Sequence, residues 1–321
     1  MSKKIKTIDR LFSKYSAQII LVLLFIFFSL ECKGRFFTAD NMITIVRQVT
    51  TMGIAALGVS FLMITGNLDF SIGAIYALVG VMTTLLYTAA GMNIYLAMLI
   101  SFICGTLLSC FTCFVSITFK IPRLVTSLAM NMVMGGVAYL ISGSKTLYGL
   151  PESIKWLGQG HIWAIPISMI FLVILAMMVS FILKKTFFGR YMFAVGGNPD
   201  VARLSGINVN KVNYIASFIC GALVSFSGLI SMSRTFCGSP SAGGSLSADV
   251  ISAAVLGGVS IMGGTGKTSG LMTGVLIMGV LSVGLNMMGM LTNPQQIFKG
   301  IMLLLAIILD SRSKRLAASA S

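Results

Sequence analysis

One uninterrupted apolar stretch decides the class of fold. It reads Ile94-Tyr-Leu-Ala-Met-Leu-Ile-Ser-Phe-Ile-Cys-Gly-Thr-Leu-Leu-Ser-Cys-Phe-Thr-Cys-Phe-Val-Ser-Ile-Thr-Phe119 and contains no charged residue. A helix of about 20 such residues can cross the hydrocarbon core of a membrane. Similar runs occupy residues 19–30, 163–183 and 301–309. None of them alternates as the strands of a membrane barrel do, so the sequence predicts an all-α bundle of membrane helices whose backbone groups pair within each helix.

Composition supports this class and argues against others. Hydrophobic residues make up 56% of the 321 residues and charged residues only 10%, whereas soluble domains carry about 25% charged residues. The net charge of +15 would suggest nucleic acid in a soluble protein, but here the charges lie between apolar runs. His161 is the only histidine, and no Ser/His/Asp or Cys/His set is available for catalysis. We therefore expect no catalytic residue, no metal site and no nucleic-acid partner.

The apolar runs predict about ten membrane spans in a single domain that covers residues 1–321, with a disordered tail at about 313–321. The spans are placed at 16–32, 43–65, 71–88, 94–118, 124–142, 162–183, 213–233, 248–262, 268–288 and 296–310. The segment 248–262 is short enough to be a half-helix. The basic N-terminus lacks a signal-peptide cleavage site, which favours a retained first helix.

The loop charges predict the orientation of the bundle. With both termini cytoplasmic, seven of the 23 Lys and Arg residues fall outside and the other 16 fall inside, in accord with the positive-inside rule. The seven are Lys33, Arg35, Arg47, Lys145, Lys155, Arg234 and Lys299. We therefore expect a multi-pass protein of the cell inner (plasma) membrane.

Two acidic residues stand against segments at membrane depth. Asp69 opens the span at 71–88 and Asp249 opens the span at 248–262, each followed by small and aliphatic residues that end in Gly. These spans have opposite predicted directions, as an inverted repeat requires. Each acid is either a helix N-cap or a functional charge at a gate; the cap is the favoured interpretation. Asp69, Ser71 and Asp249 are therefore gating or translocation candidates.

The longest predicted cytoplasmic loop, at about 184–212, encodes a short, bracketed helix. Asn198 is a good N-cap and Pro199 suits the first helical position. Gly206 supplies a left-handed stop, and Asn210 can cap the following span. A helix of about two turns is unstable alone, so it must pack against the protein's own helix ends or a partner, which is the geometry of a helix that transmits motion from an ATPase.

The same loop carries a family resemblance. Gly189-Arg190-Tyr191, Ala194-Val-Gly-Gly-Asn198 and Ala202-Arg203-Leu-Ser205-Gly206-Ile-Asn-Val resemble the permeases of bacterial carbohydrate-uptake ABC transporters of the ribose, xylose, allose and galactose type. Gly66-Asn-Leu-Asp-Phe-Ser-Ile-Gly73 is similar to the family's Gly-Gly-Ile-Asp-Leu-Ser-Val-Gly. Residues 253–264 and 284–289 also match, so the resemblance covers nearly the whole chain. Asn67 and Phe70 depart from the pattern, which bears on the substrate and not on the family.

The resemblance implies a fold like that of the vitamin B12 importer and a set of partners. These are a cytoplasmic ABC ATPase, a periplasmic sugar-binding protein and a second permease copy, identical or related. The residues expected to couple to the ATPase are Gly189, Arg190, Asn198, Pro199, Ala202, Arg203, Ser205 and Gly206. The expected cargo is a monosaccharide, a ribose-like pentose or a hexose; the alternatives are a non-sugar solute such as an autoinducer or an amino acid, or ion-coupled secondary transport.

Neutral cargo requires neutral hydrogen-bonding groups along the pathway, and ATP must be hydrolysed elsewhere. The pathway candidates are Ser127, Thr126, Asn131, Ser282 and Asn286; for each one taken singly, a hydrogen bond between helices is the favoured interpretation. Gly263-Gly-Thr-Gly-Lys-Thr268 resembles a phosphate loop, but the required earlier glycine is Ile261. We therefore expect no cofactor on this chain and ATP with Mg²⁺ on the partner ATPase.

Overall fold

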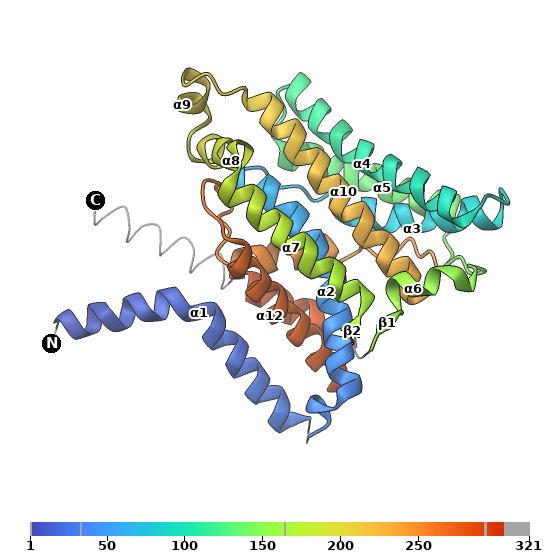
Figure 1. Ribbon diagram of the computed structural model, residues 1–321, viewed down its shortest axis with the longest axis horizontal. Coiled ribbons are helices and arrows are strands. Elements are labelled where there is room, and N and C mark those ends of the chain that lie inside the picture. Colours follow the sequence, from blue (N-terminus) through green and yellow to red (C-terminus); the bar gives the residue numbers. More distant parts are fainter. Residues whose placement is uncertain (1, 33, 164, 292–293, 305–321) are drawn as a thin grey trace.

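The computed structural model describes residues 2–32, 34–163, 165–291 and 294–304, with side chains from Ala17 onward. This part of the chain forms a helical bundle with one short β-hairpin (Figure 1). In chain order the elements are α1 (Ser2–Glu31), the 3-10 helix η1 (Arg35–Phe37), α2 (Ala39–Ile64), α3 (Ile72–Thr88), α4 (Ile94–Thr118), α5 (Arg123–Ile141), the 3-10 helix η2 (Glu152–Ile154), α6 (Lys155–Gly158), β1 (His161–Ile162), β2 (Ile165–Pro166), α7 (Ile167–Lys185), α8 (Phe187–Gly197), α9 (Pro199–Leu204), α10 (Val209–Thr235), α11 (Leu246–Leu256) and α12 (Thr268–Met287). Residues 294–304 are also helical.

The predicted spans fall on helices, and the multi-helix membrane bundle is confirmed. Six helices are long and apolar enough to cross a membrane, namely α2, α4, α5, α7, α10 and α12. Three shorter apolar helices, residues 17–31, α3 and α11, accompany them. The count of ten stays a prediction, because residues 305–310 of the last span lie outside the described residues, as does the predicted tail at 313–321.

The structure corrects three local predictions. The span at 162–183 begins only at Ile167, because His161–Ile162 and Ile165–Pro166 pair as a hairpin. The loop after α7 contains a helix, α8, that was not predicted in addition to the expected short helix α9. The segment at 248–262 shortens to α11, so the half-helix interpretation of this segment is the correct one.

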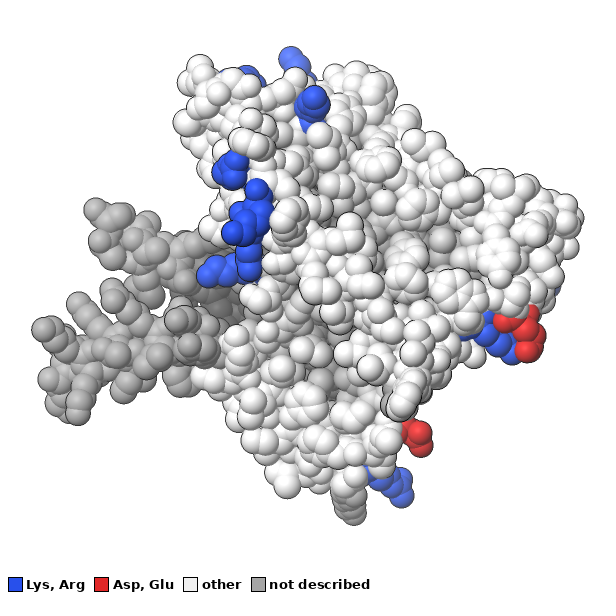
Figure 2. Space-filling view, viewed as in Figure 1, with Lys and Arg blue, Asp and Glu red and all other residues white. Residues whose placement is uncertain are grey.

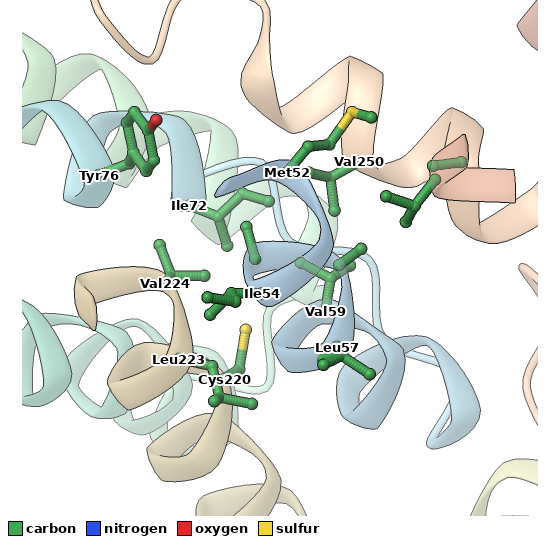
Figure 3. Close-up of a cluster of buried hydrophobic side chains, with 14 of the residues drawn as sticks. Met52, Ile54, Leu57, Val59, Ile72, Tyr76, Cys220, Leu223, Val224 and Val250 are labelled. Carbon is green, nitrogen blue, oxygen red and sulfur yellow. The ribbon is translucent and has the colours of Figure 1, made fainter. Parts of the chain in front are cut away.

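Helices α2 and α10 form the centre of the bundle. Side chains of α2, α3, α10 and α11 interlock there, including Met52, Ile54, Ile72, Val224 and Val250 (Figure 3). Small residues permit the close approach: a Cβ on Gly58 of α2 would lie 3.1 Å from the backbone oxygen of Cys220 in α10. Helices α4, α5 and α7 have large apolar side chains exposed on their outer faces, as helices that face lipid do.

The short helices α3 and α11 run in opposite directions. The contacts that these two helices make with α10 and α12, and the contacts of α10 and α12 with α2, establish their directions. Helices α10 and α2 are antiparallel, because Cys220 faces Gly58 and Ser227 faces Thr51, whereas α10 and α3 are parallel, because Gly228 faces Tyr76 and Met232 faces Gly80. Helices α2 and α12 are antiparallel, because Gly53 faces Val275 and Val49 faces Gly279. Helices α11 and α12 are also antiparallel, because Ala253 faces Gly274 and Gly257 faces Gly270. Thus α3 is antiparallel to α2, whereas α11 is parallel to it.

The first residues of α3 and α11 meet inside the bundle. Ser247 Oγ donates to the Phe70 carbonyl oxygen at 2.8 Å and accepts from the Gly73 N–H at 3.0 Å. A Cβ on either Gly73 or Gly243 would overlap with the backbone carbonyl of the other glycine. Two interrupted helices that start side by side and run apart are the arrangement expected of an inverted repeat.

The bundle has two chemically different ends, the α9 end and the hairpin end that carries β1 and β2 (Figure 1). Lys and Arg gather over the α9 end, and the middle of the visible face is almost free of charge (Figure 2). The helix ends and short helices of the α9 end carry Lys184, Lys185, Arg190, Arg203, Lys211 and Lys267. This distribution matches the predicted loop charges.

Candidate functional site

The start of α3 is held by a buried ion pair, which we call the α3 junction. Asp69 Oδ2 accepts from Arg123 Nη2 at 2.8 Å and from Nε at 3.3 Å. Asp69 Oδ1 accepts from the Ser71 N–H at 2.9 Å and from Ser71 Oγ. The Asp69 side chain is fully buried and that of Arg123 is 3% exposed. A charge pair so deeply buried depends on complete hydrogen bonding, because each ion has lost its water.

Asp69 is therefore only partly the N-cap that was predicted. The N-cap position of α3 is Ser71, whose side chain caps nothing. The Asp69 carboxylate instead fixes the backbone N–H of Ser71 and neutralises Arg123. Sequence reasoning placed Arg123 among the cytoplasmic loop charges, and the structure corrects this, because Arg123 is the first residue of α5 and is buried. The available signal was a lone basic residue, directly after Pro122, at the start of an apolar run.

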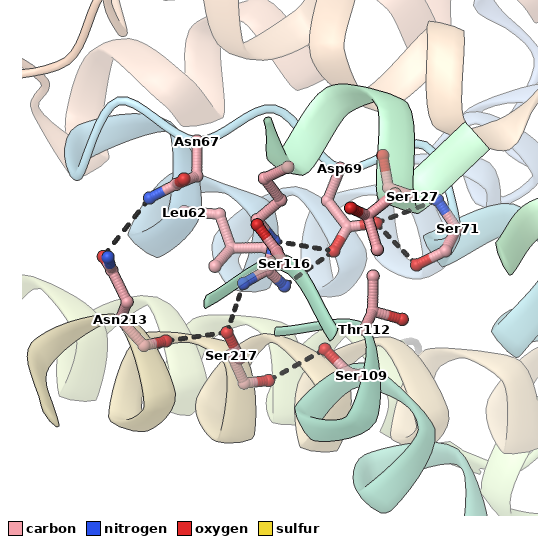
Figure 4. A network of polar contacts seen from close by, with 12 residues as sticks. Leu62, Asn67, Asp69, Ser71, Ser109, Thr112, Ser116, Ser127, Asn213 and Ser217 are labelled. Carbon is pink, nitrogen blue, oxygen red and sulfur yellow. Dashed lines mark hydrogen bonds and ion pairs between the residues drawn. The ribbon is translucent and has the colours of Figure 1, made fainter. Parts of the chain in front are cut away.

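A polar network extends the α3 junction to the neighbouring helices (Figure 4). Arg123 Nη1 donates to Ser217 Oγ of α10 at 2.6 Å, and Ser109 Oγ of α4 donates to the Ser217 carbonyl at 3.0 Å. Asn67 Nδ2 reaches Asn213 Oδ1 at 3.2 Å. The segment that leads into α3 is thus tied to α4, α5 and α10, and it cannot shift without breaking several buried hydrogen bonds.

The start of α11 has a related arrangement, which we call the α11 junction. Asp249 Oδ2 accepts from Lys299 Nζ at 2.7 Å and from Ser245 Oγ at 3.1 Å. The side chains of Asp249 and Lys299 are 12% and 15% exposed. The predicted N-cap role of Asp249 is wrong, because Ser245 occupies the N-cap position and Asp249 lies in the first turn. Its negative charge still suits the positive end of the helix.

The two junctions correspond in position. In each, an Asp at the start of a short helix pairs with a cation on the second helix after it. The partners are 54 residues apart in the α3 junction and 50 apart in the α11 junction. Since α3 and α11 run in opposite directions, this pairing strengthens the inverted-repeat interpretation.

A polar pocket adjoins the α11 junction. It has a volume of about 380 Å³. Its lining consists of Asn41, Thr44, Gln48, Ser282, Val283, Asn286, Met287, Gln295 and Lys299. Two of the predicted pathway residues, Ser282 and Asn286, thus line the same pocket. Asn131 lies on α5, belongs to neither junction and does not line the pocket.

The helix pair at the α9 end follows the predicted bracketing closely. Asn198 Oδ1 accepts from the N–H groups of Asp200 and Val201, Pro199 is the first residue of α9, and Gly206 adopts a φ of +82° after its end. The predicted cap for α10 is wrong by two residues: Asn208 accepts from the Lys211 N–H in place of Asn210.

The other predicted coupling residues serve different roles at this end. Gly189 packs against the last turn of α7, and the Arg190 guanidinium lies 4.3 Å from the centre of the Phe187 ring. Ala202 is buried, and Arg203 makes an exposed ion pair with Asp200. Ser205 Oγ donates to the Val201 carbonyl at 2.9 Å.

The apolar surface of α9 is divided between the protein and solvent. Ala202 packs inward, but Leu204 is 90% exposed and Val201 is 57% exposed. These two exposed side chains are the apolar contacts that α9 could offer to a partner. The arrangement therefore provides a capped helix with an exposed apolar tip at an end of the bundle that carries many basic residues.

Comparison with known proteins shows which family the chain resembles. The family model described as branched-chain amino acid transport system / permease component matches residues 41–307. The ribose import permease protein RbsC of Escherichia coli (strain K12) is 32% identical over 87% of this chain and 88% of its own length. RbsC of Bacillus subtilis (strain 168) is 32% identical over 85% of each chain, and the xylose transport system permease protein XylH of E. coli (strain K12) is 28% identical over 92% of this chain and 91% of its own.

No solved structure matches the chain. The range matched by the family model includes the segments that build the two junctions and α9. The chain belongs to the family of the branched-chain amino acid transport system / permease component.

Proposed function

We propose that this chain is the membrane permease subunit of an ABC importer that carries a monosaccharide, a ribose-like pentose or a hexose, across the inner membrane. The similarity to ribose and xylose import permeases over most of the chain supports the class of cargo. A separate ATPase subunit supplies the energy, a periplasmic binding protein delivers the sugar, and a second permease copy completes the pathway. In this proposal the α9 end faces the cytoplasm.

The single observation that carries the energy coupling is the geometry of α9. Asn198 and Gly206 fix its two ends, and the exposed Leu204 offers an apolar contact for a partner. Movement of α9 would pass through α8, whose Gly196 packs directly on the end of α2. In alternating access the bundle would then open to one side at a time.

The alternatives differ in what drives transport and in what is carried. Ion-coupled transport requires an intramembrane acid that is free to bind a proton or Na⁺, but both Asp69 and Asp249 are already ion-paired. An amino acid or an autoinducer in place of the sugar fits the same fold. The choice between these cargoes is therefore a matter for transport measurements.

The test is uptake in proteoliposomes that contain the chain with its ATPase and binding protein. We expect ATP-dependent uptake of labelled ribose or xylose, and no uptake when the ATPase is omitted. Leucine and a furanone autoinducer serve as competing cargoes. Uptake driven by a proton or Na⁺ gradient without the ATPase, or competition by leucine alone, would contradict the proposal.

Coupling through α9 is tested by Gly206→Val. The φ of +82° at Gly206 is unfavourable for a β-branched residue, and no other group lies near its Cβ position. We expect the variant to reach the membrane normally but to hydrolyse ATP without sugar uptake. Gly197→Ala is the matched control, since Gly197 has equal space without a positive φ. Uptake at the parent rate in Gly206→Val would contradict a coupling role for α9.

The orientation of the chain is tested by a reporter fused after Ser321. We expect a cytoplasmic signal, and a periplasmic signal would contradict the orientation.

A further inference from the structure

We infer that the pocket between α2, α12 and residues 294–304 is a binding site for a neutral, hydroxyl-rich solute of monosaccharide size. This inference rests on the proposed function and names the place on this chain where the cargo is held. The pocket volume of about 380 Å³ falls within the range of small-molecule sites. It lies at the start of α2 and the end of α12, toward the hairpin end of the bundle.

The pocket presents hydrogen-bonding groups that the protein does not use up. The side chains of Ser282 and Asn286 have no hydrogen-bond partner among the described residues. Gln48 Oε1 accepts from Arg234, which leaves its amide N–H groups for a ligand. Gln295 Nε2 donates to the Met290 carbonyl, which leaves its Oε1 as an acceptor. Donors and acceptors are thus both available, as the hydroxyl groups of a sugar require.

The charge in the pocket is balanced. Among the described residues that line it, Lys299 is the only charged one, and its ammonium group is engaged by Asp249 at 2.7 Å. A carboxylate ligand would have to compete with Asp249 for Lys299, and an ammonium ligand would find no free acid among the described lining residues. A zwitterionic amino acid is therefore disfavoured relative to a neutral polyol.

The two apolar lining residues suit the same ligand. Val283 and Met287 supply a patch for the C–H face of a sugar ring, while amides and hydroxyls surround it. Such sites combine an apolar wall with a small number of placed polar groups. Lys299 both lines the pocket and holds Asp249, so a bound ligand lies directly beside the first turn of α11.

Thiol labelling tests this inference on the intact complex. Ser282→Cys places a thiol in the pocket, and its reaction with a water-soluble methanethiosulfonate is measured with and without ribose, xylose or leucine, after subtraction of the parent chain's labelling. Thr273→Cys, on the same helix but outside the pocket, is the control. We expect ribose or xylose to slow labelling at position 282 only. Protection by leucine and not by sugar, or no protection by any of them, would overturn the inference.

A second variant separates binding from simple accessibility. Asn286→Leu in the Ser282→Cys background keeps the side-chain size but removes the amide, and we expect the sugar concentration for half-protection to rise about two- to tenfold, the worth of one neutral hydrogen bond. Asn210→Leu, an exposed asparagine at the α9 end, should leave it unchanged. An unchanged half-protection in Asn286→Leu would count against direct recognition. If uptake of sugar is intact while no protection occurs, the pocket inference fails and the proposed function stands; if no sugar is taken up by the complete system, the proposed function itself fails.

Discussion

The α3 junction and the α11 junction each pair an aspartate with a basic side chain, but in different surroundings. Asp69 and Arg123 are sealed inside the bundle and share a network that reaches α4 and α10. Asp249 and Lys299 are partly exposed and border a pocket. Because desolvation sets the cost of breaking an ion pair, the first junction should act as a rigid fixed point and the second as a contact that can be altered at low cost.

The largest effect should come from removing the buried cation. Arg123→Met leaves the Asp69 carboxylate buried without a counter-charge, and we expect a loss of about 3–5 kcal/mol of stability. Thermal unfolding in nanodiscs and the amount of protein in the membrane report it. Adding Asp69→Asn should restore most of the loss, because no uncompensated charge remains. A loss below about 1 kcal/mol in the single variant would show that water reaches the α3 junction.

The contact between the two junctions should be the next most sensitive place. In Gly243→Ala the new methyl group overlaps with the Gly73 carbonyl, so α3 and α11 must separate, at a cost of about 1–3 kcal/mol. Gly136→Ala, where a Cβ meets no atom within 4 Å, is the matched control. Equal unfolding temperatures for the two variants would disprove the close approach of the half-helices.

Removing the partly exposed cation of the α11 junction, Lys299, should cost less. For Lys299→Met we expect a loss of about 1–2 kcal/mol, since water can solvate Asp249 from the pocket. The exchange Asp249→Lys with Lys299→Asp should be tolerated better than Asp69→Arg with Arg123→Asp, because Asp69 also accepts from the Ser71 N–H and hydroxyl. The unfolding temperatures of the two double variants measure this difference. Equal decreases in unfolding temperature would contradict the distinction between a junction sealed from water and one that water reaches.

The smallest effect should come from an ion pair on the surface. Arg203 and Asp200 of α9 are 66% and 83% exposed, and Arg203→Gln should change stability by no more than about 0.5 kcal/mol. Unfolding of the isolated chain measures this, and ATP-dependent uptake of the complete system measures any role toward the partner. A loss of stability as large as that for Lys299→Met would show that the contribution of the three ion pairs to stability does not follow their exposure to solvent.

Local chemistry along the chain was sufficient to predict several features. Apolar runs located the helices, and the order Asn198, Pro199, Gly206 located α9 and both its ends. These features depend on residues close in sequence, since a span needs only length and hydrophobicity and a cap needs only the first or last turn of a helix. The missed helix α8 and the β1–β2 hairpin lie in stretches whose composition resembles a continued apolar span or a loop.

The charges were harder to assign, and the reason is physical. Arg123 looked like one more loop cation, and Asp249 looked like an N-cap, because their partners are 54 and 50 residues away. The sequence by itself determined where the long apolar helices lie, and that two spans begin beside an acid. Only the tertiary structure decided which cation each acid meets and whether water reaches the pair, because pairing and burial arise from packing between helices and not from the order of residues within one.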